Sequence, residues 1–315
     1  IELNNECNLK CRCCLKNRSS GNVILPFKTI KKTLEEAKSM GISYVRFTGG
    51  EPLIRKDIVK ILRYTKQNGF TVFLNTNGFL LDKKKIESIE NYVDNILISI
   101  CGYNSRLEEE LSGINQNLEL KFINIVRVKN SKIPYVRVGT IISKILIREF
   151  DNYFKLISTL GIKNWELYRP MLSKHIMKKY QQYNLTKNDF LRLMHYVKRL
   201  RNSGMNAYIA NALPFCITKN KGLKTVLNGA RFDDGHSRLV LDAQGYFKPS
   251  YFINKNLGKS IKKAWNHKFI RNINSLQCLP YRCKRCYYLK WCLGGSRYLA
   301  KESKGSYFCS DPLMG

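Results

Sequence analysis

The segment Tyr44-Val-Arg-Phe-Thr-Gly-Gly-Glu-Pro-Leu53 joins a short apolar stretch to a Gly-rich polar loop. Its first five residues have the β-branched and aromatic composition of a buried strand. Five further stretches before residue 170 are of the same kind, each short and bounded by polar residues or Gly. They are residues 1–5, 71–75, 95–101, 135–142 and 164–169. The sequence therefore predicts six strands in its first half.

Amphipathic segments separate these strands, with apolar residues recurring at helical spacing. They cover residues 30–37, 58–65, 83–92, 117–128 and 147–160. Strands that alternate with helices favour a parallel sheet, because each crossover returns the chain to the same edge. A short repeat of this kind closes most simply into a full or partial barrel. We therefore expect an α/β fold, a partial TIM-like (β/α)6 barrel.

Four polar segments fall where the expected strands end. They are the Cys-rich loop 7–14, Thr48-Gly49-Gly50-Glu51, Asn75-Thr76-Asn77-Gly78 and Ser99-Ile100-Cys101-Gly102. In parallel barrels the C-terminal ends of the strands meet at one face, and active sites lie there. The shared position of these segments predicts the active site at that face without reference to any single motif.

The character of the chain changes after an amphipathic stretch at 187–201. From residue 206 the sequence is richer in Gly, turns and Cys, and its helical periodicity is poor. Turn signals at 233–235 and 242–245 flank a strand-like segment at 237–241, which indicates a hairpin. We place a domain boundary near residue 205, with the barrel over 1–205 and a smaller domain over 206–315.

The composition is strongly basic, because 55 Lys and Arg against 23 Asp and Glu give a net charge of +32 over 315 residues. Such a charge suits nucleic acid or an acidic partner. The basic residues are scattered, however, so we interpret the excess mainly as compositional background. No run of about 18 apolar residues is present, which argues against a membrane-spanning helix. The chain shows no signal peptide, and because it begins at Ile1 and not at Met we expect a segment upstream.

The 11 cysteines fall mostly into two clusters, one near each end of the chain. Disulfide frameworks belong mainly to short secreted chains, so tight Cys spacings in a long chain indicate metal or iron–sulfur ligation in a cytoplasmic protein. Cys7, Cys11 and Cys14 have C-x3-C-x2-C spacing. Such a loop can aim three thiolates at three irons of a cubane and leave the fourth iron open for chemistry. A zinc site is the alternative that spacing leaves open.

This loop, together with Gly49-Gly50-Glu51-Pro52-Leu53, resembles the radical S-adenosylmethionine (SAM) superfamily. The resemblance implies a [4Fe–4S] cluster on Cys7, Cys11 and Cys14, with the amino and carboxylate groups of SAM on the open iron. Glycines would allow close backbone approach to the SAM ammonium. The implied SAM contacts are Gly49, Gly50, Glu51 and Pro52 at the ammonium, and Asn77 and Ser99 at the carboxylate and ribose. One departure is Cys13, which stands where the family usually has an aromatic residue.

Cys101 is a second departure. Related peptide-modifying members often read Ser-x-Asp-Gly at the fourth strand, whereas this chain reads Ser99-Ile-Cys101-Gly. Ser99 and Cys101 share one face of the strand, because side chains alternate with a period of two. A Cys101 thiol that faces the SAM site could donate a hydrogen atom to a substrate radical. A Cys simply packed in the strand is the alternative.

The C-terminal cysteines resemble the SPASM/Twitch extension of radical SAM enzymes. Residues 283–296 read C-x2-C-x5-C-x3-S, and a further Cys follows. The resemblance implies one auxiliary [4Fe–4S] cluster, with the ligands Cys283, Cys286, Cys292 and Cys309. A second auxiliary cluster is not expected, because Ser296 and Ser250 stand where the family has Cys and only Cys216 and Cys278 remain. Structural zinc on the same four thiols is the alternative.

The resemblance implies an enzyme that reductively cleaves SAM to a 5′-deoxyadenosyl radical, which abstracts hydrogen from a substrate in the barrel mouth. We expect a ribosomally made peptide or protein as substrate, and a low-potential electron donor such as flavodoxin or ferredoxin. A radical SAM dehydrogenase of a sugar or aminocyclitol is the first alternative. A zinc-binding, basic nucleic-acid-binding protein is an alternative of another class, but it leaves the Gly-Gly-Glu-Pro segment unexplained. Neither nucleic acid nor a membrane is an expected partner.

Overall fold

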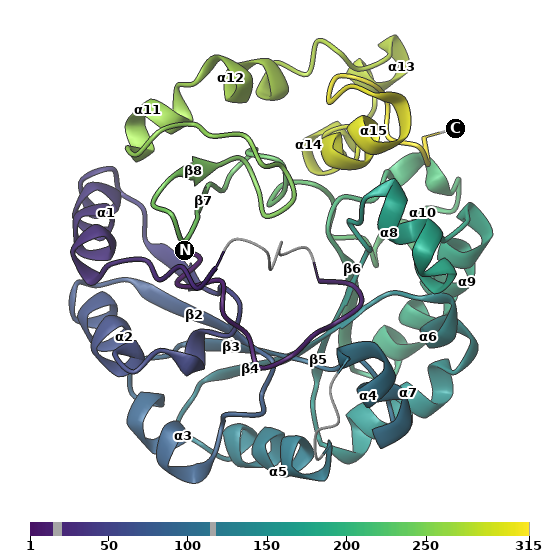
Figure 1. Ribbon diagram of the computed structural model, residues 1–315. Helices are drawn as coiled ribbons and strands as arrows, with labels where there is room; N and C mark the ends of the chain where they lie inside the picture. Colours follow the sequence, from purple (N-terminus) through teal and green to yellow (C-terminus); the bar gives the residue numbers. More distant parts are fainter. Residues whose placement is uncertain (15–20, 114–117, 315) are drawn as a thin grey trace.

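The computed structural model describes residues 1–14, 21–113 and 118–314. A curved six-stranded sheet lies at its centre, and helices surround the outer side of the sheet (Figure 1). The C-terminal third, green to yellow in Figure 1, spans the opening between the two edges of the sheet. The molecule is therefore an incomplete barrel whose open side is covered by the end of the chain.

All six strands are parallel and pair in chain order, from β1 at one edge to β6 at the other. The strands are β1 (Tyr44–Phe47), β2 (Thr71–Thr76), β3 (Asn95–Ser99), β4 (Tyr135–Ile141), β5 (Asn164–Tyr168) and β6 (Asn206–Ala210). In the described part of the chain β1 and β6 do not pair with each other, so the barrel stays open. The predicted α/β fold with a partial TIM-like barrel is confirmed.

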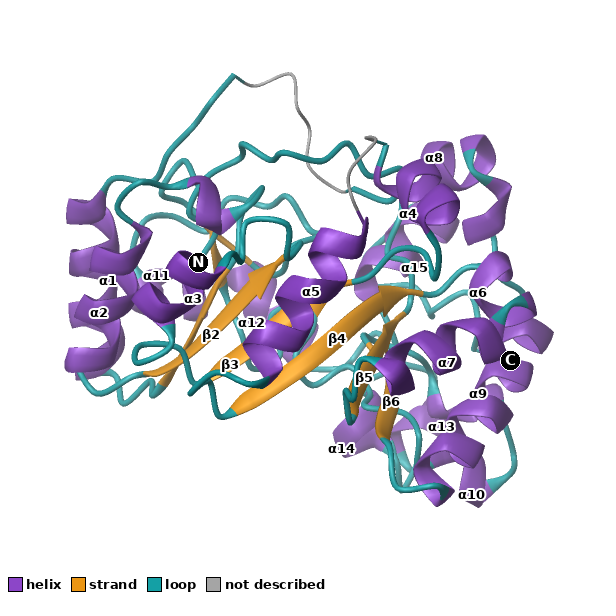
Figure 2. Ribbon diagram, turned by 90° about the horizontal axis from the view of Figure 1, so that it is seen from below, coloured by secondary structure: helices purple, strands orange, loops and turns teal. Residues whose placement is uncertain are grey.

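One helix precedes β1, the others connect the consecutive strands, and most of them cover the outer face of the sheet (Figure 2). They are α1 (Phe27–Ser39), the 3-10 helix η2 (Pro52–Ile54), α2 (Ile58–Gln67), α3 (Lys83–Ile89), α4 (Ser105–Ser112), α5 (Leu118–Lys129), α6 (Lys144–Arg148), α7 (Phe150–Thr159), α8 (Lys174–Lys179), η3 (Gln181–Tyr183) and α9 (Lys187–Asn202). Local signals set several boundaries. The Asn104 side chain caps α4, and Thr186 and Asp189 form a capping box at α9.

The sheet differs from the sequence prediction at both ends. Residues 1–5 run beside the end of β1 but form only isolated bridges, with Leu3 N–H donating to Thr48 O at 2.7 Å. The strand expected over 1–5 is therefore wrong as a regular strand of the sheet. The sixth strand is instead β6, which the sequence analysis does not predict, because Asn206-Ala-Tyr-Ile-Ala has few β-branched residues. It lies just beyond the boundary placed at residue 205, and the division into 1–205 and 206–315 stays a prediction.

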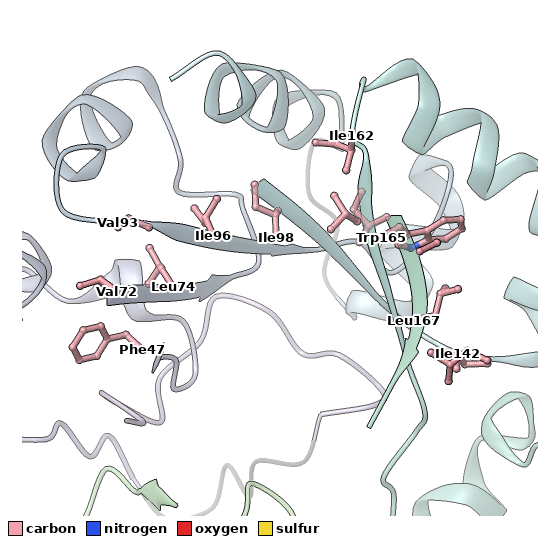
Figure 3. Close-up of a cluster of buried hydrophobic side chains, with 14 of the residues drawn as sticks. Phe47, Val72, Leu74, Val93, Ile96, Ile98, Ile142, Ile162, Trp165 and Leu167 are labelled. Atoms are coloured by element: carbon pink, nitrogen blue, oxygen red, sulfur yellow. The ribbon is translucent and has the colours of Figure 1, made fainter. Parts of the chain in front are cut away.

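The two faces of the sheet have opposite characters. The outward side chains are apolar and buried beneath the helices, as Figure 3 shows for Phe47, Val72, Leu74, Val93, Ile96, Ile98, Ile142, Ile162, Trp165 and Leu167. Each such buried side chain contributes roughly 1.5–3 kcal/mol. The intervening positions include polar and charged residues such as Arg46, Asn75, Ser99, Arg137 and Glu166, which face the inside of the barrel. This alternation fixes the register of the strands, because a slip of one residue would exchange the two faces.

The C-terminal segment consists of a hairpin and short helices. These are η4 (Phe215–Ile217), α10 (Lys221–Lys224), β7 (Val240–Leu241), β8 (Phe247–Lys248), α11 (Ile261–Trp265), α12 (Lys268–Asn274), α13 (Tyr281–Lys284), α14 (Leu289–Cys292) and α15 (Arg297–Lys304). The hairpin expected around residues 237–241 is confirmed. It contacts the start of the chain, since Glu2 N–H donates to Leu241 O at 2.8 Å. No helix within the described ranges is long and apolar enough to cross a membrane.

Candidate active site

The predicted cluster loop, residues 7–14, is fastened to the C-terminal end of α4. Lys10 N–H donates to Ser112 O at 2.8 Å, and Arg12 N–H donates to Leu111 O at 3.0 Å. The last carbonyls of a helix have no partner within the helix itself, so the loop supplies the donors that this helix end needs. These two hydrogen bonds fix the position of the loop relative to α4 and hence to the barrel.

The three predicted ligands of this loop, Cys7, Cys11 and Cys14, are partly exposed cysteines that form no disulfide with the described residues. Two donors approach the Cys7 sulfur, Leu9 N–H at 3.4 Å and Asn77 Nδ2 at 3.9 Å. Such donors favour a thiolate, which is the form that binds iron. Among the residues described, no three His, Cys, Asp or Glu side chains converge on one metal ion. A cubane does not require that convergence, because each thiolate binds a different iron, and the donor set fits a [4Fe–4S] cluster.

Gly49 and Gly50 pack directly against the first residues of the chain. A Cβ atom at Gly50 would lie 1.8 Å from Glu6 O, and one at Gly49 would lie 2.4 Å from Asn4 Oδ1. Gly50 N–H also donates to Asn4 O at 2.8 Å. The close approach of two backbone segments therefore requires glycine at both positions, apart from any approach of SAM. The predicted SAM contacts of Gly49 to Pro52 stay a prediction.

The Glu51 carboxylate joins the loops that follow β1 and β2. It is 1% exposed, and its Oε1 accepts from Thr76 Oγ1 at 2.8 Å and from Leu53 N–H at 3.1 Å. Its Oε2 accepts from Asn77 N–H at 2.8 Å. Burial raises the pKa of Glu51, although these three donors favour its charged form. Asn77 Nδ2 in turn donates to Asn8 Oδ1 at 2.7 Å, so one network links both loops to the cluster loop.

Ser99 and Cys101 line the same small cavity of about 60 Å³, as their spacing predicts. Cys13 and Tyr183 also line it. A hydrogen bond with the Cys11 side chain, together with burial, raises the pKa of Cys101 well above its usual range. The structure therefore places the Cys101 thiol inside the barrel and beside a predicted cluster ligand.

A buried ion pair holds the end of β3, and the sequence analysis does not predict it. Lys121 Nζ of α5 lies 2.6 Å from Glu108 Oε1 of α4, and neither side chain is more than 2% exposed. Glu108 Oε2 accepts from Cys101 N–H at 2.8 Å and from Gly102 N–H at 2.6 Å. The pair therefore positions the backbone at Cys101. The available signal was periodicity, because Lys121 stands at helical spacing from the buried Leu118.

A second unpredicted group of charges lies inside the barrel. Arg137 of β4 pairs with Glu166 of β5, whose carboxylate also accepts from the hydroxyls of Tyr168 and Tyr208. Arg46 of β1 occupies an equivalent inward position. Each of these charged residues stands between apolar neighbours in its strand. That pattern was a usable signal, since helices cover the other face of a parallel sheet and a charge can only point inward.

The predicted auxiliary ligands lie on short helices and turns. Cys283 belongs to α13, Cys292 ends α14, Cys286 lies between them and Cys309 follows α15. Cys286 N–H donates to Cys283 O at 3.0 Å. Burial raises the pKa of both Cys283 and Cys292, and the charge of Cys216 adds to the effect on both. Cys216 thus lies near Cys283 and Cys292, and the four-cysteine ligand set stays a prediction.

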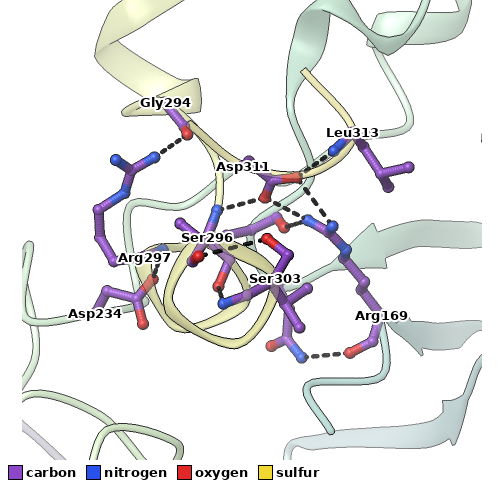
Figure 4. A network of polar contacts seen from close by, with 12 residues as sticks. Arg169, Asp234, Gly294, Ser296, Arg297, Ser303, Asp311 and Leu313 are labelled. Atoms are coloured by element: carbon purple, nitrogen blue, oxygen red, sulfur yellow. Dashed lines mark hydrogen bonds and ion pairs between the residues drawn. The ribbon is translucent and has the colours of Figure 1, made fainter. Parts of the chain in front are cut away.

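Ser250 and Ser296, which the resemblance places at two cysteine positions of the SPASM/Twitch pattern, are fully buried in a polar network. Ser296 N–H donates to Asp311 Oδ2 at 2.7 Å, and Ser250 Oγ donates to Asp234 Oδ1 at 3.5 Å. Figure 4 shows that the Asp311 carboxylate also receives both Nη groups of Arg169, at 2.8 and 3.0 Å. A carboxylate therefore lies beside each of the two serines, and the expectation of a single auxiliary cluster stays a prediction.

Residues 1–157 match the family model described as "Radical SAM superfamily". Along its whole length the chain is similar to the AdoMet-dependent heme synthase of Methanosarcina barkeri (strain Fusaro / DSM 804). The two are 23% identical over 333 aligned residues, which cover 99% of this chain and 94% of the relative.

Two solved structures share the fold over nearly the whole chain. One is native anSMEcpe with bound AdoMet and Cp18Cys peptide, with a TM-score of 0.76 and 15% identity, covering 99% of this chain and 91% of the other. The other is Streptococcus suis SuiB bound to the precursor peptide SuiA, with a TM-score of 0.78 and 20% identity, covering 99% and 74%. The likeness extends through the C-terminal segment and is not confined to the barrel.

Proposed function

This chain belongs to the radical SAM superfamily and is an enzyme, and from this premise we propose that it abstracts hydrogen from a peptide or protein substrate. The observation that carries the proposal is the single hydrogen-bonded network of the cluster loop, Glu51 and Asn77 beside the cavity of Ser99 and Cys101. Membership in an enzyme superfamily decides against the alternative of a zinc-binding nucleic-acid-binding protein.

The cofactors of this family are a [4Fe–4S] cluster and SAM, which when bound supply a 5′-deoxyadenosyl radical. The protein contributes binding, orientation and exclusion of water. Cys7, Cys11 and Cys14 would hold three irons, and the Leu9 N–H and Asn77 amide donors would stabilise the Cys7 thiolate. Leu97, Ile141 and other apolar side chains line the neighbouring cavity, where they would help to exclude water from the reaction.

For SAM itself, we assign Gly49, Gly50, Glu51 and Pro52 to the ammonium, and Asn77 and Ser99 to the carboxylate and ribose. The Glu51 carboxylate already accepts three hydrogen bonds within the protein, so the segment would offer backbone carbonyls to the ammonium. Ser99 is the exposed end of β3 and faces the cavity, where a ligand can reach it.

A peptide substrate is supported by the two structural neighbours, which were solved with peptides bound. The charge of +32 suits an acidic segment of such a peptide. A small-molecule substrate is the second candidate, and the heme synthase relative favours it because the similarity covers 94% of that protein. Dehydrogenation of a sugar or aminocyclitol belongs to this second group. The electron would come from a low-potential donor such as flavodoxin or ferredoxin.

We assign Cys101 as the hydrogen donor to the substrate radical. Its thiol lines the cavity with Ser99, and Glu108 fixes its backbone. Transfer of the hydrogen atom forms a C–H bond in the substrate and breaks the S–H bond, leaving a sulfur radical. One electron from the low-potential donor and one proton from water then restore the thiol. In deuterated water the wild-type product should gain deuterium at the reacting carbon, and Cys101→Ala should lose this label. An unchanged product and label in the variant would remove Cys101 from the mechanism.

We further propose one auxiliary [4Fe–4S] cluster on Cys283, Cys286, Cys292 and Cys309. After anaerobic purification the protein should carry about eight irons, from two four-iron cubanes. It should form 5′-deoxyadenosine with dithionite, and Cys7→Ala, Cys11→Ala or Cys14→Ala should lose this activity and about four irons. Cys13→Ala is the matched control, because Cys13 lies in the same loop and should leave the iron content unchanged. A colourless, zinc-loaded protein without turnover would contradict the proposal.

A further inference from the structure

A second cavity, of about 140 Å³, lies inside the barrel beneath the C-terminal segment. Its lining includes Arg46 of β1, Asn75 of β2, Tyr168 of β5, and Arg169 and Arg238 from farther along the chain. Cys13 also lines it, and both Cys13 and Tyr168 line the cavity of Ser99 and Cys101 as well, so the two cavities are neighbours. A molecule in this cavity would therefore lie next to the cluster loop.

The three arginines of the cavity differ in how their charges are balanced. Arg169 is neutralised by the Asp311 carboxylate, at 2.8 and 3.0 Å. Arg46 has no ion pair with any of the described residues, and its guanidinium lies 5.4 Å from the centre of the Phe73 ring. The positive charge of Arg46 is therefore not balanced by a carboxylate of the described residues, in contrast to the charge of Arg169.

Arg238 has only a weak partner. Its nearest carboxylate oxygen is Asp233 Oδ1, at 3.5 Å, and its buried Nε atom has no hydrogen-bond partner in the described part of the chain. Burial raises the pKa of Asp233 to about 7, so this carboxyl is only partly ionised at neutral pH. The cavity therefore carries a positive charge that the protein does not fully balance.

The cavity also contains an acceptor without a donor. Asn75 Oδ1 is buried and has no hydrogen-bond partner among the described residues. A buried carbonyl oxygen without a donor costs free energy, so an N–H or O–H group of a ligand would be favoured there. An acidic residue of a peptide offers both complements, a carboxylate for the guanidinium groups and an amide N–H within the same molecule.

We propose that this cavity binds an acidic side chain of the substrate, with the carboxylate on Arg46 and Arg238 and an amide N–H on Asn75 Oδ1. The assignment rests on the proposed function and narrows its substrate to a carboxylate-bearing group. Guanidinium groups hold carboxylates through paired hydrogen bonds, which fix orientation as well as charge. A carboxylate held in this way would fix a neighbouring carbon of the substrate beside the cluster loop.

The test is calorimetric titration of the anaerobically reconstituted holoenzyme. The probe is N-acetyl-glutamic acid N′-methylamide, and the neutral comparison is the corresponding glutamine compound, which has nearly the same shape. The acid should bind the wild type, and Arg46→Gln or Arg238→Gln should weaken its binding about 10- to 100-fold, as expected for a charge-assisted hydrogen bond. Arg46→Lys should retain part of the affinity, because lysine keeps the positive charge but cannot make the two parallel hydrogen bonds of a guanidinium group.

Arg271→Gln is the matched control, since Arg271 is exposed on α12 and should leave binding unchanged. Equal binding of acid and amide, or binding of neither at millimolar concentration, would overturn the proposal. The carboxylate could also belong to a small-molecule substrate and not to a peptide. Heme is the probe for this case, since its propionates carry carboxylate groups. Binding of heme that depends on Arg46 and Arg238, without binding of the acidic probe, would overturn the assignment to a peptide. Because titration does not require SAM cleavage, failure of this inference is distinguishable from failure of the proposed function.

Discussion

The two cysteine regions are held in place by different kinds of interaction. The loop over 7–14 takes its shape from backbone hydrogen bonds to α4 and from the Asn77 side chain. The region over 283–309 lies on α13 and α14, each four residues long, and on the eight-residue α15. It is held by hydrogen bonds of Asp234 and Asp311, and Asp311 also forms a buried ion pair with Arg169. Helices of four residues are not stable alone, because nucleation costs more than so few hydrogen bonds return.

From this difference we expect that the loop over 7–14 serves mainly catalysis and that the region over 283–309 serves mainly stability. The hydrogen bonds that hold the first loop on α4 involve its backbone and not its thiols, so losing a ligand there should affect chemistry more than folding. In the second region a cluster would link segments that have little regular structure of their own, and metal binding of that kind contributes directly to folding. Substitutions in the two regions can test whether the roles divide in this way.

The largest expected effect comes from replacing one predicted ligand in each region. Cys14→Ala should abolish the dithionite-dependent formation of 5′-deoxyadenosine, measured by chromatography, with little change in the melting temperature. Cys286→Ala should instead lower the melting temperature strongly, because it removes a ligand of the auxiliary cluster that we propose to join α13 and α14. Both variants should lose about four irons, one cubane each. If Cys14→Ala lowers the melting temperature as much as Cys286→Ala does, the comparison fails.

Asp311→Asn should produce the next largest effect. The substitution leaves the Arg169 guanidinium, which is 3% exposed, without its charged partner. Breaking a buried ion pair on one side costs about 3–5 kcal/mol, so the free energy of unfolding in urea should fall by that amount. Asp151→Asn is the control, because the exposed pair between Asp151 and Arg199 should contribute at most about 1 kcal/mol. Similar losses in the two variants would show that buried charge does not support the C-terminal region.

Asp233 makes the stability of the C-terminal region dependent on pH. Burial raises its pKa from 3.8 to about 7, so between these values the native state holds a proton that the unfolded chain has released. The contribution of Asp233 is therefore fully present below pH 3.8 and is lost as pH rises through 7. Asp233→Asn should remove this loss, which amounts to at most about 4 kcal/mol at 1.4 kcal/mol per unit. Urea unfolding across the part of this range in which iron is retained measures it, and a constant difference between variant and wild type would contradict the assignment.

The smallest expected effect concerns the barrel side of the comparison. Glu51→Gln replaces an oxygen acceptor with an amide that faces one of the donors at Leu53, Thr76 or Asn77. The free energy of unfolding should fall by about 1–3 kcal/mol, the cost of a buried unsatisfied group. Glu109→Gln, at an exposed site in α4, is the control. A loss as large as that of Asp311→Asn would show that side-chain contacts support this region as strongly as the other.

The sequence was sufficient for the parts of the fold that depend on local pattern. Strands β1 to β5 follow from short β-branched stretches, and helices α1, α2, α3, α5, α7 and α9 follow from periodicity. Helix α4 and the short helices after residue 210 do not. The segment over 1–5 has the composition of a strand but joins the sheet only through isolated bridges, whereas β6 forms because β5 offers it a partner edge. Tertiary pairing, which local composition does not encode, decided both cases.

The residues of the candidate site likewise fall into two groups, those that local sequence patterns predict and those that depend on tertiary packing. Its cysteines and the Gly-Gly-Glu-Pro segment are recognisable as motifs, and their arrival at one edge follows from the parallel topology. Periodicity can mark Lys121 as buried, but it does not identify Glu108 as the partner of Lys121, because the two residues lie on separate helices. The carboxylates beside Ser250 and Ser296 are hidden for the same reason. Such pairs become visible only when the packing that buries them is known.

The contact between Glu2 and Leu241 has a consequence for how the protein is made. Strands β1 to β6 pair in chain order, so the barrel can form progressively as the chain is synthesised. The first residues, by contrast, complete their contacts only when Leu241 and Lys248 have emerged. Until then the segment that leads into the cysteine loop lacks these contacts. The start of the chain is thus one of the last parts of the molecule to be completed during synthesis, after the six strands of the sheet have emerged.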